Sequence, residues 1–133
     1  MQVNTYLTFN GNCKEAFEFY AKSLNGKIEA MMSHAGTPAE QHVPAEWRNK
    51  IIHARMTIGN EVLMASDAPP DRYEQPQGFS VNLGFRDEAE AKRIYDELST
   101  NGKIIMPFGP TFWAKAFAMF VDRFGTPWMI NCE

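Results

Sequence analysis

The side chain best suited to chemistry in this 133-residue chain is a histidine within an apolar stretch. His53 alternates with Arg55 and Thr57, so strand geometry would place these three polar side chains on one face. Imidazole titrates near neutral pH, which makes His53 the candidate general base. An ordinary hydrogen-bonded histidine on a solvated strand explains the same pattern, and both interpretations stay open. His34 and His42 lie in or beside a loop and are expected on the surface.

The acids and thiols that could support a site have structural explanations. Asp67 and Asp122 each end a predicted strand, where aspartate usually accepts hydrogen bonds within a turn. Cys13 and Cys132 lack the CxxC spacing of zinc and redox sites, which favours two buried thiols. Neither Ser nor Cys stands in a recognisable nucleophile motif.

Large aromatic side chains occupy positions outside the predicted elements. Phe112 and Trp113 lie in a short turn, and Trp47 lies in a long loop. Such rings must cover the core, a partner chain or a ligand, and with Trp128 they could line an apolar pocket for a flat organic molecule.

Composition excludes several classes of partner. The net charge is -3 and no cluster of Lys or Arg stands out, so nucleic acid is not expected as a partner. The chain has no apolar run of about 18 residues and no signal-like start, which predicts a cytoplasmic protein without a membrane span. Without a GxGxxG or Walker motif, we expect no nucleotide or S-adenosylmethionine cofactor.

The chain contains an internal duplication. Glu15-Ala16 before Tyr20, followed by the NGKI stretch 25–28, recurs as Glu90-Ala91 before Tyr95, followed by NGKI at 101–104. Asn12 with Glu15 would form a capping box at the first helix, Asp87 with Glu90 would cap the second, and Gly26 and Gly102 would end the two helices. Alternating or β-branched runs predict eight strands, namely Val3–Phe9, Lys27–Ser33, Ile51–Ile58, Glu61–Ser66, Phe79–Phe85, Lys103–Phe108, Lys115–Val121 and Pro127–Cys132.

Each half is therefore a βαβββ module, and the fold class is α+β. We expect one domain in which module 1 spans about 1–67, a linker spans about 68–77 and module 2 spans about 78–133. The segment 34–49 has little periodicity, and it is expected to be either a functional lid or disordered.

Two tandem βαβββ modules resemble the glyoxalase/bleomycin-resistance (vicinal oxygen chelate) superfamily. The local sequences are similar to its PhnB-like branch over nearly the whole chain, at YLTFNGNC (6–13), HAR (53–55), LMASD (63–67), TFW (111–113), DRFG (122–125) and PWMIN (127–131). The resemblance implies curved mixed sheets around a central cavity and a homodimer.

The resemblance also locates the positions at which metal-dependent relatives hold a divalent ion. Here those positions fall on Thr5, Met64, Ser80 and Met129. A hydroxyl or thioether is a poor ligand for such an ion, and no negative charge remains to offset its dehydration. We therefore expect no metal and no cofactor.

The leading hypothesis is a metal-independent protein that binds a small apolar or aromatic organic ligand, with Trp113 or Trp47 at the rim of the cavity. Its predicted ligand-binding residues are Thr5, Leu7, Met64, Ser66, Ser80, Asn82, Trp113, Met129 and Asn131. The alternative is a lyase, isomerase or dioxygenase with a metal site rebuilt from His53, Asp67, Asp122 or Glu61. A third interpretation is a purely structural dimer.

Overall fold

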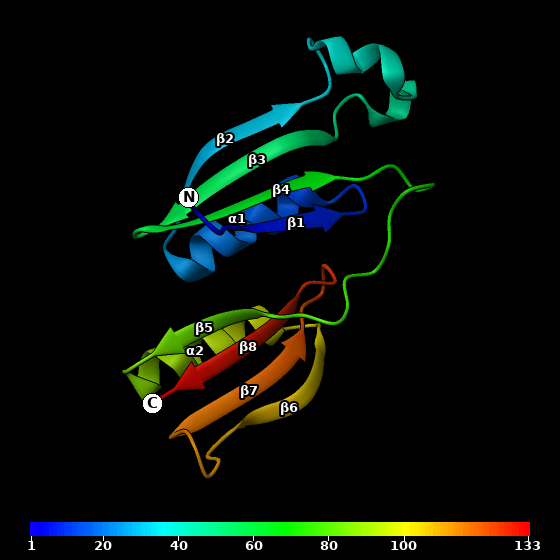
Figure 1. Cartoon of the computed structure of the whole chain (residues 1–133). Helices are drawn as coiled ribbons and strands as arrows, with labels where there is room; N and C mark the ends of the chain where they lie inside the picture. Colours follow the sequence, from blue (N-terminus) through cyan, green and yellow to red (C-terminus); the bar gives the residue numbers. More distant parts are fainter. The chain divides into compact units, whose positions relative to one another are not determined.

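The protein consists of two compact units, Met1–Glu74 and Gln75–Glu133, in a computed structural model that describes residues 1–133. Each unit contains a four-stranded mixed sheet and one long α-helix that packs on one face of it (Figure 1). The predicted α+β fold of two βαβββ modules is confirmed. No helix is long and apolar enough to cross a membrane.

The first unit has its strands in the spatial order β1-β4-β3-β2. Strands β1 and β4 are parallel, and the other neighbours are antiparallel. In chain order, the elements are β1 (Thr5–Phe9), α1 (Cys13–Leu24), β2 (Lys27–Ser33), β3 (Ile51–Ile58) and β4 (Glu61–Asp67). Strand β1 begins two residues later than predicted, because Val3 is 90% exposed and pairs with no strand.

The second unit repeats this topology in the order β5-β8-β7-β6, with β5 parallel to β8. Its elements are β5 (Val81–Phe85), α2 (Glu88–Ser99), β6 (Lys103–Gly109), β7 (Ala116–Val121) and β8 (Pro127–Cys132). The match confirms the duplication inferred from sequence.

The two helices begin in different ways. At α2, the Asp87 carboxylate accepts from the backbone N–H of Ala89 at 3.0 Å, as predicted. At α1, Asn12 makes no capping bond, so the predicted capping box is wrong. The first-turn N–H of Cys13 is instead bound at 3.0 Å by Asp67, which reaches the helix from the end of β4.

The repeated NGKI stretches end the helices through asparagine. Asn25 and Asn101 adopt the left-handed conformation, with φ of 55° and 60°, where glycine was expected to serve. The adjacent glycines leave room for strands that come close, β3 at Gly26 and β7 at Gly102. A Cβ on Gly26 would lie 2.7 Å from the Met56 sulfur, and one on Gly102 would lie 2.3 Å from the Val121 carbonyl oxygen.

The segment 34–49 is structured. It contains two 3₁₀-helices, Pro38–His42 and Ala45–Trp47. His34 is buried, contrary to expectation, and its Nδ1 lies 3.0 Å from the Lys50 carbonyl oxygen. The Trp47 ring is also buried and packs over Gly11, so it belongs to the core of the first unit.

Alternation along the strands divides each sheet into a helix-covered face and an open face. In the first unit, Leu7, Phe9, Met56 and Leu63 are buried with Phe17 and Tyr20 of α1. In the second unit, Phe120, Trp128 and Ile130 are buried with Ile94, Tyr95 and Leu98 of α2. Each such side chain contributes about 1.5–3 kcal/mol when it leaves water. The core thus fixes which strand residues remain on the open face.

Candidate functional site

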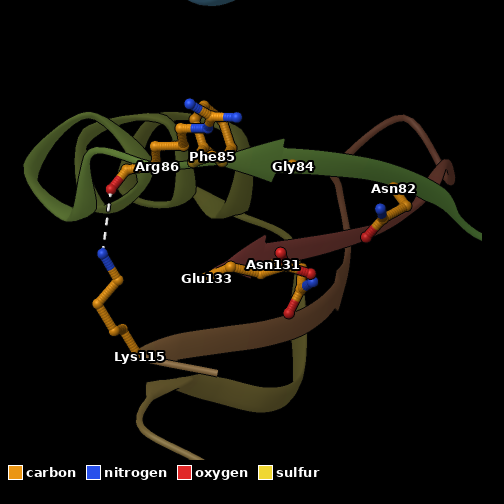
Figure 2. Close-up of a pocket in the computed structure, with 7 residues that line it drawn as sticks. All are labelled: Asn82, Gly84, Phe85, Arg86, Lys115, Asn131 and Glu133. Atoms are coloured by element: carbon orange, nitrogen blue, oxygen red, sulfur yellow. Dashed lines mark hydrogen bonds between the residues drawn. The ribbon is translucent and has the colours of Figure 1, made fainter. Parts of the chain in front are cut away.

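A pocket of about 540 Å³ lies on the open face of the second unit. Figure 2 shows the amides of Asn82 and Asn131 projecting from neighbouring strands β5 and β8. Gly84 pairs with Asn131 in the sheet, and a Cβ on Gly84 would meet nothing within 4 Å. The missing side chain leaves space beside the Asn131 amide. The full lining is Asn82, Gly84, Phe85, Arg86, Lys115, Asn131 and Glu133.

The Asn131 side chain has an unmet hydrogen-bonding requirement. Its Oδ1 is buried and has no hydrogen-bond partner within the protein. Burying a polar atom in this state costs about 1–3 kcal/mol, so a fold optimised for stability alone would replace it. The amide is therefore suited to bind a donor group that enters the pocket.

Aromatic and thioether side chains lie on the same open face as the pocket. Trp113 is half exposed, and its ring packs edge-on against Phe117 with centroids 5.3 Å apart. Phe117 pairs with Asn131 in the sheet, and Met119 pairs with Met129. This face combines hydrogen-bonding amides with apolar area that can contact an organic ligand.

The open face of the first unit has a different character. The Tyr6 hydroxyl lies 3.3 Å from His53 Nδ1, and the two rings stack with centroids 5.9 Å apart. Met64 on β4 is paired with Arg55 on the neighbouring strand β3 and with Tyr6 on the other neighbouring strand, β1. Ser66 lies two residues further along β4.

The predicted site residues fall into two groups. Met64 and Ser66 lie on the open face of the first unit, and Asn82, Met129 and Asn131 lie on that of the second. Ser80 lies just before β5, two residues from Asn82, so strand alternation would place both side chains on the same face. Trp113 lies in the turn before β7.

Two predicted residues lie elsewhere. Leu7 is 2% exposed and packs in the core between the sheet and the helix. Thr5 is two residues earlier on β1 and therefore lies on the same face of the sheet as Leu7. The open-face residues of β1 are Tyr6 and Thr8. Sequence reasoning therefore missed Tyr6, because tyrosine occurs in cores as readily as on exposed faces.

Two of the carboxylates named in the alternative hypothesis, Asp67 and Asp122, are engaged in hydrogen bonds within the protein. The Asp67 carboxylate accepts from the backbone N–H groups of Gly11, Cys13 and Ile51 at 2.9, 3.0 and 2.8 Å. Asp122 accepts from the N–H groups of Phe124 and Thr126 and from the Trp128 indole. Both carboxylates tie backbone segments together, as their positions at strand ends predicted.

The paired positions of the first and last strands in each unit offer poor ligands for a divalent ion. Where a first and a last strand of one unit pair side by side, the facing residues are Tyr6 with Met64 and Asn82 with Met129. These donors are neutral, and two are thioethers, which hard and borderline dications bind poorly.

Cys13 is fully buried at the start of α1. Burial, and next the nearby Asp67 carboxylate, raise the pKa of the Cys13 thiol far above its ordinary value. The thiol thus stays protonated and acts as a packing group.

Comparisons with known proteins now assign the family. The family described as 3-demethylubiquinone-9 3-methyltransferase matches residues 1–131. The chain belongs to this family. The predicted resemblance to the PhnB-like branch of the vicinal oxygen chelate superfamily is confirmed.

Individual relatives agree with this assignment. Protein YjdN of Escherichia coli is 34% identical over 139 residues, which cover 98% of this chain and 95% of YjdN. The crystal structure of PA1353 from Pseudomonas aeruginosa has 48% identity and a TM-score of 0.91, and covers 100% of this chain and 98% of PA1353. The Bacillus cereus PhnB protein, a putative 3-demethylubiquinone-9 3-methyltransferase, has a TM-score of 0.85 at 21% identity over the full length of both chains, which shows the shared fold.

The family description names a methyltransferase, and that chemistry would require a methyl donor such as S-adenosylmethionine. That donor is a sulfonium cation. The pocket of the second unit has two cationic side chains, Arg86 and Lys115, against one carboxylate, Glu133. The lining therefore lacks the net negative charge that would favour a sulfonium cation.

Proposed function

We propose that this PhnB-like chain is a metal-independent binding protein for small organic molecules, and that each open sheet face is a binding surface in its own right. The observation that carries the proposal is the buried, unpartnered Asn131 Oδ1 in the wall of a 540 Å³ pocket. A pocket of this volume lies within the range of about 300–1,000 Å³ that is typical of small-molecule sites.

The character of the ligand follows from the pocket lining and from the sheet face around it. Within the lining, Asn82 and Asn131 offer directional hydrogen bonds beside charged side chains. On the surrounding face, aromatic and polarizable surface is offered by Trp113, Phe117, Met119 and Met129. This combination favours a flat, largely apolar molecule with one or two polar groups.

We also propose that the protein acts as a homodimer. Strand β6 is an edge strand whose Ile104, Ile105 and Met106 are 48%, 56% and 40% exposed. An exposed apolar edge favours aggregation unless another surface covers it, and a second copy of the chain would do so.

The test uses the neutral fluorescent probe N-phenyl-1-naphthylamine. Fluorescence titration should show saturable binding to the wild-type protein. Gly84→Leu fills the open space beside Asn131 and should weaken probe binding at least tenfold without lowering the melting temperature. Ala89→Leu is the control, since Ala89 is exposed on α2, away from the open sheet face, and is outside the pocket lining.

Two results would overturn the proposal. The first is an absence of saturable probe binding combined with native mass spectra of freshly purified protein that show no bound organic molecule. The second is one equivalent of a transition metal that survives dialysis in elemental analysis, which would remove the claim of metal independence.

A further inference from the structure

We infer that the open face of the first unit, taken by itself, binds an oxyanion group of a small organic molecule, with Arg55 as its counter-ion and the Tyr6–His53 pair as a positioning element. This inference rests on the proposed binding function and specifies the ligand as an organic anion, with a carboxylate or sulfonate.

The first argument is the electrostatic state of Arg55. Its side chain is half buried on β3, and its guanidinium makes no ion pair and no side-chain hydrogen bond. The acids of the neighbouring strands form no ion pair with it. Glu29 accepts from the Thr57 hydroxyl at 3.1 Å, and Asp67 is bound by three backbone N–H groups.

A partly desolvated cation without a counter-ion is unfavourable for the fold, because charge is stabilised by water or by an opposite charge. Arginine also presents a planar fork of donors that matches a carboxylate or sulfonate. The position therefore favours an oxyanion that arrives with the ligand.

The second argument is the arrangement beside Arg55. His53 lies two residues before Arg55 on the same strand and face. The contact between the Tyr6 hydroxyl and His53 Nδ1, at 3.3 Å, with the stacked rings, holds the imidazole in place. When the hydroxyl donates to Nδ1, the proton of a neutral imidazole is on Nε2, which then adds a second donor for the anion.

The third argument is the comparison of the two duplicated units. Arg55 pairs with Met64 in the first unit, and Met119 pairs with Met129 at the equivalent place in the second. Two residues earlier on the same strands, His53 corresponds to Phe117. The fold thus accepts apolar side chains at both positions, so the cationic and imidazole groups are not required to form the sheet.

The duplication therefore separates two kinds of recognition. The face of the first unit, with Arg55, His53 and Tyr6, suits an oxyanion. The face of the second unit has Phe117 and Met119 at the equivalent positions and offers apolar surface there. Both are properties of the individual units.

The experiment compares two probes that differ only by an anionic group. 8-Anilinonaphthalene-1-sulfonate carries a sulfonate on the frame of N-phenyl-1-naphthylamine. The wild-type protein should bind the sulfonate at least tenfold more tightly. Arg55→Met should abolish this preference, leave the affinity for the neutral probe within twofold of wild type, and keep or raise the melting temperature.

The control variant is Arg72→Met, which removes an exposed arginine beyond β4 and should leave the preference unchanged. Arg55→Lys keeps the charge without the planar fork and should restore only part of the preference. Tyr6→Phe removes the hydroxyl that contacts His53 and should weaken sulfonate binding while leaving the neutral probe unaffected.

The outcomes separate this inference from the proposed function. If the neutral probe binds but Arg55→Met retains the preference for the sulfonate, the inference is wrong and the binding function stands. If neither probe binds the wild-type protein, the binding function fails and the inference fails with it. A preference lost equally in Arg72→Met would show general surface attraction and would also refute the inference.

Discussion

Replacing Asp67 by asparagine provides a direct test of how the first unit is held together. The carboxylate Oδ1 accepts from Gly11 and Cys13, and Oδ2 accepts from Ile51, at 2.8 to 3.0 Å. These bonds join the end of β4 to the start of α1 and the start of β3. Because Asp67 is 6% exposed, water cannot replace a lost bond easily.

The magnitude follows from the geometry of an amide. Asparagine can keep the two bonds to its single oxygen, but its NH₂ group would face the Ile51 N–H, so that bond is lost. One hydrogen bond to a charged acceptor is worth about 1.5–3 kcal/mol. The two remaining bonds also lose charge assistance, and the helix loses the anion at its N-terminus, worth up to about 1 kcal/mol. We expect Asp67→Asn to lower the free energy of unfolding by about 3 kcal/mol.

Urea unfolding followed by circular dichroism measures this difference. Asp67→Ala should be more destabilising than Asp67→Asn, since it leaves all three N–H donors without a partner. Asp71→Asn, in the exposed segment after β4, is the control and should stay close to wild type. A loss of less than about 0.5 kcal/mol for Asp67→Asn, typical of a surface change, would refute the reasoning.

Two further predictions concern a binding residue and a buried thiol. Asn131→Leu removes the unpartnered Oδ1 and should raise the free energy of unfolding of the ligand-free protein by about 1 kcal/mol. Urea unfolding measures this change. A clear loss of stability would show that the amide has a structural partner. The Cys13 pKa is raised in the folded state, so the folded chain retains a proton that the unfolded chain releases above the ordinary thiol pKa. Stability should therefore fall as pH rises beyond that value, by up to about 1.4 kcal/mol per pH unit from this group. In Cys13→Ala the decline should be shallower, and identical pH profiles for the two proteins would count against the assignment.

The sequence predicted most of the fold because its local signals agree with one another. In β5, Val81, Leu83 and Phe85 alternate with Asn82 and Gly84, so the polar or small residues mark the open face without ambiguity. Helix α2 likewise carries its own cap in Asp87. Each of these features depends on residues close together in the chain.

The errors arise where a local signal is ambiguous or where the deciding partner is distant. In β1, Tyr6 and Leu7 are both compatible with a core, and only the packed structure shows that Leu7 faces the helix. The cap of α1 comes from Asp67, which is 54 residues away from Cys13 in the sequence, so no capping pattern near Asn12 could reveal it.

The same limit explains why the sequence alone does not indicate the proposed anion-binding face. The alternation of His53 with Arg55 is visible in the chain, but an alternating polar strand is usually a solvated one. What distinguishes this strand is the absence of an acidic partner for Arg55 and the contact of His53 with Tyr6 from another strand. Both are properties of tertiary structure. The equivalent positions of the second unit, Phe117 and Met119, then show that these polar groups are dispensable for folding, which is the reason to expect that they serve binding.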